Sequence, residues 1–250
     1  KIMVGQKILA INSFYPALFY FLLISISPEA IQLSPALVSI GFILLGLNKI
    51  LSCYLNKNAY SKVFDCGFLI SLAGLIHPPF LIFTPLVWIG MSIFSQVEWR
   101  HWVLSYIGMI CPWFIVYTMA TFFSIDQLNP ISFFSFLLLG NQTATLNWGD
   151  FISLSAFGLL STISISDLVV SLRQKNIKAR KSYILLLWTL PLALAYSCLS
   201  NDLFHVKLLI FAIPLSATIS NYFYFHKKPG WLNFLTFSIA LILIANHFLF

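Results

Sequence analysis

The sequence predicts an all-α protein, a polytopic bundle of about nine helices that span a membrane. Hydrophobic residues make up 60% of the chain and charged residues only 8%, and the mean hydropathy is +0.91. A water-soluble domain has roughly 45–50% apolar and about 25% charged residues. The apolar stretches run from one end of the chain to the other, with no polar domain between them. We therefore expect residues 1–250 to form a single membrane-embedded domain.

Polar interruptions divide the chain into stretches that are long enough to cross a bilayer. A hydrocarbon core about 30 Å thick needs about 20 helical residues, and fewer when flanking side chains reach the interface. The predicted spans are 8–26, 35–52, 63–77, 79–95, 102–123, 151–172, 183–199, 208–225 and 231–250.

The third and fourth spans are short, and they meet at His77-Pro78-Pro79-Phe80. Two adjacent prolines exclude a continuous unkinked helix and bias the preceding residue away from the helical conformation. We expect a tight helical hairpin that turns at the outer face of the membrane. The alternative, a single kinked or half-inserted helix pair, would invert every later span.

The basic residues test this segmentation independently. If the spans alternate from a cytoplasmic N-terminus, thirteen of the fourteen Lys and Arg residues fall on one side, and only Lys207 falls on the other. The positive-inside rule assigns the basic side to the cytoplasm. The C-terminus is then outside, and the net charge of +7 follows from this bias.

The densest positive charge lies in one predicted cytoplasmic loop, between spans six and seven. Its basic residues are Arg173, Lys175, Lys178, Arg180 and Lys181. We expect this loop to orient the two spans and to contact anionic lipids, with an acidic protein partner as the alternative. A nucleic-acid interface needs aromatic or glycine-rich interleaving on a folded surface, so we expect no nucleic-acid partner.

The only long connection between spans covers residues 124–150 and contains no Lys or Arg. Within it, the mostly apolar segment 131–140 lies between a helix start signal, Asn129-Pro130, and a stop signal, Gly140-Asn141. Such a segment is too short to span. It is expected to be re-entrant or to lie in the outer interface, or to form a loop helix packed on neighbouring spans.

Ionisable residues are nearly absent from the middle of the predicted spans, where a charge is expensive and usually functional. Asp65 and Asp167 lie near predicted cytoplasmic helix ends, where each acid can reach water or pair with a nearby base. His77 is placed at the outer turn, and Asp150 at the start of the sixth span.

Four further outer residues are candidates for catalysis: Glu29, Asp126, Asp202 and His205. If they converge on one outer cleft, they would suit a metal- or phosphate-dependent transferase; otherwise they are ordinary solvated loop residues. The sequence contains no HxxxH or DxD motif, and the four cysteines, Cys53, Cys66, Cys111 and Cys198, are far apart. We expect no metal and no cofactor, and we interpret the cysteines as buried packing residues.

The sixth span carries a stripe of small residues on one helix face: Ser155, Gly158, Thr162 and Ser166. Small residues at such spacing let helix backbones approach closely in lipid. The expected role is packing within the chain, and contact with another subunit is the alternative.

The segment from Leu44 to Phe114 carries a further pattern. A basic loop leads into Lys62-Val63-Phe64-Asp65, an aliphatic hairpin follows, and Trp99-Arg100-His101-Trp102 precedes the next span. This pattern resembles an uncharacterised family of polytopic inner-membrane proteins from Bacteroidetes, although Cys66 replaces the alanine that the pattern has there. The resemblance implies no known activity.

A fainter similarity is to polytopic glycosyltransferases that use lipid-linked sugar donors. It rests on the many spans, the kinks expected at Pro191 and Pro214, and the acids on outer loops. Those enzymes generally place a catalytic Asp or Glu in a large loop after the first span. Here the loop 27–34 is short, and Glu29 is its only acid.

Three functions are therefore compatible with the sequence. The first is a non-catalytic subunit or scaffold of a cell-envelope complex in the bacterial inner membrane, with the lipid bilayer and other membrane-protein subunits as partners. The second is a lipid-linked glycosyl- or phospholipid-group transferase that acts at the outer face. The third is a permease for a neutral or lipid-like substrate.

Overall fold

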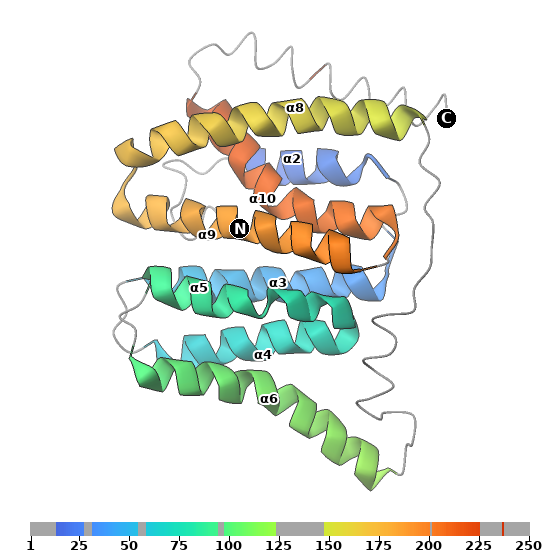
Figure 1. Ribbon diagram of the computed structural model, residues 1–250, viewed down its shortest axis with the longest axis vertical. Coiled ribbons are helices and arrows are strands. Elements are labelled where there is room, and N and C mark those ends of the chain that lie inside the picture. Colours follow the sequence, from blue (N-terminus) through green and yellow to red (C-terminus); the bar gives the residue numbers. More distant parts are fainter. Residues whose placement is uncertain are drawn as a thin grey trace.

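The computed structural model describes residues 14–27, 32–54, 59–94, 98–123, 148–200 and 202–225, together with residue 237. Within these residues every regular element is helical. The elements are α2 (Tyr15–Ile24), α3 (Pro35–Leu51), α4 (Tyr60–Ile76), η2 (Pro78–Phe83), α5 (Pro85–Phe94), α6 (Trp99–Phe122), α8 (Trp148–Ser171), η4 (Leu172–Gln174), α9 (Ile177–Leu199) and α10 (Phe204–Phe225). Figure 1 shows the helices stacked side by side, with consecutive helices running in opposite directions.

Each predicted span from 8–26 to 208–225 overlaps a helix of the structure where its residues are described, and the span 79–95 covers both η2 and α5. The helices α6, α9 and α10 are long and apolar enough to cross a membrane, and shorter apolar helices cover Tyr15–Ile24, Pro35–Leu51 and Pro78–Phe94. The all-α class is thus confirmed for the described residues. The last predicted span, 231–250, and the segment 131–140 lie outside them, apart from residue 237.

The double proline produces the expected hairpin. His77 ends α4 in an extended conformation, and Pro78 then opens the 3₁₀ helix η2, which leads into α5. A Cβ atom at Gly74 would lie 2.3 Å from Cδ2 of Leu81. A larger residue there would force the Leu81 side chain to move, while the backbone nitrogen of Leu81 lies at an ordinary contact distance of 3.7 Å.

Close helix packing occurs between α4 and α6. A Cβ on Gly67 would lie 2.6 Å from the carbonyl oxygen of Ser105, and one on Gly108 would lie 2.5 Å from that of Phe64. The Ser71 hydroxyl also donates a hydrogen bond to the carbonyl of Met109, at 2.6 Å across the same interface. Two reciprocal glycines thus bring the backbones together, as is common between membrane helices.

The small-residue stripe of α8 is not used in this way. Ser155, Gly158, Thr162 and Ser166 are all exposed, and a Cβ on Gly158 would meet nothing within 4 Å. The face of α8 that packs inside the described chain instead carries Phe157, Leu160, Ser161, Ser164 and Leu168. None of the described residues therefore packs closely against Gly158, because the buried face of α8 is a different face of the helix. Contact with another subunit stays a prediction.

The acid near the start of α4 behaves as expected. Nζ of Lys49, in the last turn of α3, lies 2.7 Å from Oδ2 of Asp65. Both side chains are partly exposed, so the pair fixes the α3–α4 register more than it stabilises the fold.

Candidate functional site

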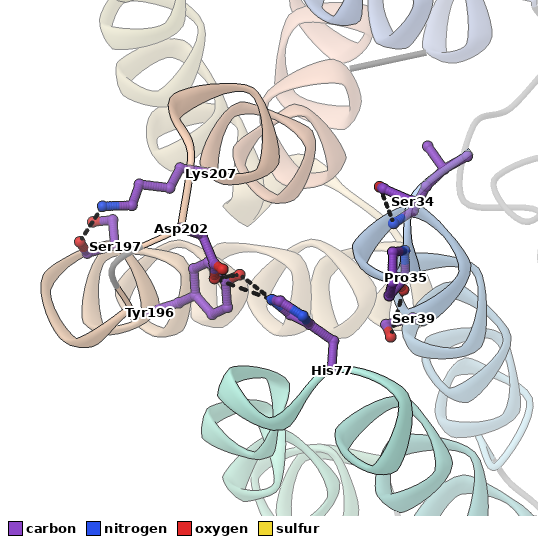
Figure 2. Close-up of polar contacts among 9 residues, drawn as sticks. Ser34, Pro35, Ser39, His77, Tyr196, Ser197, Asp202 and Lys207 are labelled. Atoms are coloured by element: carbon purple, nitrogen blue, oxygen red, sulfur yellow. Dashed lines mark hydrogen bonds and ion pairs between the residues drawn. The ribbon is translucent and has the colours of Figure 1, made fainter. Parts of the chain in front are cut away.

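Three polar side chains meet between two helical hairpins that are distant in sequence. His77 lies between α4 and η2, Tyr196 in the last turn of α9, and Asp202 in the connection to α10. Figure 2 shows them pointing toward one another. We call these three residues the His77 cluster. His77 is 125 positions from Asp202, so the cluster is a long-range tie.

The hydrogen bonds of the His77 cluster converge on one carboxylate oxygen. Nε2 of His77 lies 3.1 Å from Oδ2 of Asp202 and 3.2 Å from the hydroxyl oxygen of Tyr196. The Tyr196 hydroxyl also donates a hydrogen bond to Oδ2 of Asp202. Tyr196 is fully buried, whereas the side chains of His77 and Asp202 are 13% and 20% exposed.

The partners determine where the protons lie. An ionised carboxylate only accepts hydrogen bonds, and the single Tyr196 proton already points at Asp202. Nε2 of His77 must therefore carry a hydrogen and donate it to these oxygens. None of the described hydrogen bonds involves Nδ1 of His77, so in the neutral ring Nδ1 is the acceptor nitrogen.

Aromatic rings form one wall of the cluster. The Phe80 ring stacks on Tyr196 at 5.0 Å and contacts His77 at 5.2 Å, and Phe83 lies 6.4 Å from Tyr196. The prolines that force the hairpin also bring Phe80 into this position, because η2 follows His77 directly. An apolar wall lowers the local dielectric, which strengthens satisfied hydrogen bonds and penalises unsatisfied ones.

The hydrogen bonds decide the charge state of Asp202. Burial raises the pKa of Asp202, but the hydrogen bonds from His77 and Tyr196, aided by the nearby Ser200 hydroxyl, lower it more. The net pKa is below the ordinary carboxyl value, so Asp202 is ionised at neutral pH. Such a group contributes stability that is complete above the ordinary carboxyl pKa and is lost as the pH falls through the folded-state pKa.

The structure treats the four predicted catalytic candidates differently. Asp202 joins the cluster, while His205 lies in the first turn of α10 and takes no part in the cluster's hydrogen bonds. Glu29 and Asp126 lie outside the described residues, as does the side chain of Asp150. Tyr196 was missed, because a tyrosine inside an apolar run has the same pattern as a packing residue.

Lys207, the one basic residue expected on the outer side, has a local role beside the cluster. Its Nζ donates a hydrogen bond to the carbonyl oxygen of Ser197, at 3.0 Å (Figure 2). The carbonyls in the last turn of α9 have no helical partner, and a cation is favourable there. Lys207 therefore caps α9.

The predicted basic loop places one of its five cations inward. Lys175 donates a hydrogen bond from Nζ to Oδ1 of Asn221, at 2.7 Å, and its Nζ lies 3.8 Å from the ring centroid of Phe225 and 5.1 Å from that of Tyr183. Burial lowers the pKa of Lys175 to about 8, although Asp167 opposes the shift. We call Lys175, Tyr183, Asn221 and Phe225 the Lys175 cluster. The other four cations are at least partly exposed, and three of them, Lys178, Arg180 and Lys181, lie in the first turns of α9 and not in a loop.

The described residues contain no group of three or more His, Cys, Asp or Glu side chains that could hold a metal ion.

Within the described residues every regular element is helical, and three helices are long and apolar enough to cross a membrane. A family model matches residues 3–249, and the chain belongs to that family, DUF6427, a family of unknown function. No curated protein and no solved structure matches the chain.

Proposed function

We propose that the protein is a non-catalytic subunit or scaffold of a cell-envelope complex in the bacterial inner membrane. It has about nine spans, a cytoplasmic N-terminus and an outer C-terminus. The alternating helix directions support this topology. The end of α3 and the starts of α6 and α9 lie at one end of the stack, and the ends of α4 and α9 lie at the other (Figure 1). Lys49, Arg100 and Lys175 belong to the first set of helix ends, and the His77 cluster belongs to the second.

The observation that carries the scaffold proposal is the surface of α6. Only 22% of its membrane-length stretch is buried, against 67% of that of α10. Its C-terminal half diverges from the stack (Figure 1). Its exposed large side chains there are Ile110, Phe114, Ile115, Tyr117, Met119 and Phe122. Lipid gives apolar helices no hydrophobic drive to associate, so spans are held by close packing. A partner helix would supply the packing that this half of α6 lacks within the described residues.

A second surface, on α8, also supports the scaffold proposal. On α8, Gly158 and Thr162 are exposed on the small-residue stripe, and such a stripe suits close approach by another helix. The His77 cluster supports a non-catalytic role, because its donors are directed at its own acceptors.

Site-specific photo-crosslinking in native membranes tests this proposal. The crosslinker is placed at Phe114 or Tyr117 of α6, with Leu194 of α9 as the matched control, since Tyr117 and Leu194 are similarly exposed, at 58% and 55%. We expect one discrete protein adduct from the α6 positions and none from Leu194. Lipid adducts alone at every position would contradict a scaffold role.

The transferase at the outer face stays as a second candidate, favoured by the 3.1 Å approach of His77 to Asp202. Asp202 would orient the ring, and Nδ1 would accept a proton from a substrate hydroxyl or phosphate. The variant His77→Gln separates the two proposals, because the amide keeps a donor for Asp202 but is not a base. A scaffold retains function in vivo with this variant, whereas a transferase loses it.

A further inference from the structure

A small cavity lies among the segments that surround the α3–α4 turn. It has a volume of about 10 Å³, and eight residues line it. Three of them carry sulfur: Cys53, just after α3, Cys66, near the start of α4, and Met91, near the end of α5. The whole chain has only four cysteines and four methionines, so this convergence is a marked concentration.

All three sulfur residues are buried. Both cysteines are free thiols, and the Cys53 thiol donates a weak hydrogen bond to the carbonyl of Lys49, at 3.3 Å. The other lining residues are apolar, such as Ile50 and Val87, except for Lys62. Nζ of Lys62 donates a hydrogen bond to the carbonyl oxygen of Ser52, at 2.8 Å. The positive charge of Lys62 therefore lies at the α3–α4 turn.

The size and chemistry of the cavity suit a single soft ion better than a water molecule. A volume near 10 Å³ is about the room that one water needs, but a buried water also requires two to four polar partners. Thiolate and thioether sulfur favour Cu(I), zinc and iron–sulfur clusters, but structural zinc takes four ligands and iron–sulfur clusters take four cysteines, whereas this cavity has two cysteines and one methionine. We propose that Cys53, Cys66 and Met91 form a binding site for a soft monovalent cation, Cu(I).

Binding is balanced in charge and in protons. Cu(I) displaces one proton from each thiol and forms two copper–thiolate bonds, while the Met91 thioether adds a neutral ligand and no electron is transferred. Burial raises the pKa of Cys53 to about 11, with Lys62 opposing the shift, so the thiol keeps its proton until metal displaces it. The bound bis-thiolate complex has one negative charge, which the Lys62 ammonium offsets.

A competition titration tests the site. The full-length protein in detergent is titrated anaerobically with Cu(I) against a chromophoric chelator such as bicinchoninate. The test variants are Cys53→Ser, Cys66→Ser and Met91→Leu, and the matched controls are Cys198→Ser and Met119→Leu, whose side chains are exposed. We expect one equivalent of Cu(I) in the wild type and in both controls, loss of binding in both cysteine variants, and weaker binding in Met91→Leu.

A second measurement on the wild type guards against variants that fold poorly. Cu(I) should raise the thermal unfolding midpoint of the wild type, and Lys62→Met should weaken binding by about 10- to 100-fold, as for other outer-shell partners of a metal. A wild type that yields all its Cu(I) to the chelator would overturn the proposal. Binding that survives in both Cys53→Ser and Cys66→Ser would also overturn it.

Discussion

Different polar contacts stabilise the α9–α10 helix pair at its two ends. At the turn between the helices, the His77 cluster directs the Tyr196 hydroxyl and Nε2 of His77 at one ionised carboxylate. At the opposite end, the Lys175 cluster forms one hydrogen bond to Asn221. The buried hydroxyl of Tyr183 and the buried Nδ2 of Asn221 have no hydrogen-bond partner among the described residues.

The His77 cluster is therefore a structural tie, whereas the Lys175 end has buried polar groups with no hydrogen-bond partner among the described residues. Removing a partner from a satisfied buried cluster leaves its other members unpaired, which is destabilising. Removing a donor that has no partner carries no such penalty. We therefore expect the stability of the helix pair to be concentrated in the His77 cluster. The Lys175 end, in the proposed topology, lies on the side of the anionic leaflet.

The largest expected effect is that of Asp202→Ala. It leaves the buried Tyr196 hydroxyl and His77 without their shared acceptor, and truncating one member of such a pair costs about 2–5 kcal/mol. The free energy of unfolding in a detergent titration measures the loss. Asp202→Asn keeps an acceptor oxygen and should lose less; equal losses in the two variants would contradict this explanation.

A tyrosine pair compares the two ends directly. Tyr196→Phe keeps the stacking on Phe80 but removes a hydroxyl with a partner, so we expect a loss of about 1–2 kcal/mol. Tyr183→Phe removes a buried hydroxyl that has no partner in the described part of the chain and should be neutral or stabilising. The same detergent titration measures the unfolding free energy of both variants. A larger loss in Tyr183→Phe than in Tyr196→Phe would contradict this assignment of the two ends.

The exposed cations of the basic loop should act on lipid binding and not on folding. Each Lys or Arg near an anionic surface contributes about 1 kcal/mol of attraction. Arg173→Ala with Arg180→Ala should therefore weaken the binding of phosphatidylglycerol to the detergent-solubilised protein without changing the unfolding midpoint. The control lipid is neutral phosphatidylcholine. Equal weakening for both lipids would exclude electrostatic contact.

The last expected effect is a dependence of stability on alkaline pH. Because burial lowers the pKa of Lys175 to about 8 from 10.5, the unfolded chain binds this proton more tightly than the folded one. Stability should rise as the pH increases from about 8 to 10.5, and Lys175→Met should remove this part of the rise. Unfolding midpoints of the two proteins across that range measure the difference. Parallel curves would contradict the assignment.

The sequence predicted the helices well because hydropathy and prolines act locally. Ser34 and Pro35 mark the start of α3, and the double proline marks the turn after His77. Asp202 was found because an acid in an apolar chain is conspicuous.

The remaining site residues depend on long-range packing, which has no local pattern. Tyr196 belongs to the cluster only because the other hairpin brings Phe80 to stack on its ring and His77 within hydrogen-bond distance of its hydroxyl. Likewise, Cys66 and Met91 are separate in sequence and meet only at one cavity. The stripe on α8 shows the reverse error, because small residues favour close packing wherever a second helix is present but do not say which helix that is.

A double-mutant cycle between His77 and Asp202 measures directly whether the His77 cluster ties the two hairpins together. The unfolding free energies of His77→Ala, Asp202→Ala and the double variant give the coupling energy. We expect the two side chains to stabilise each other by about 1–3 kcal/mol. A coupling of zero, or single variants more stable than the wild type, as is common when catalytic residues are removed, would contradict it.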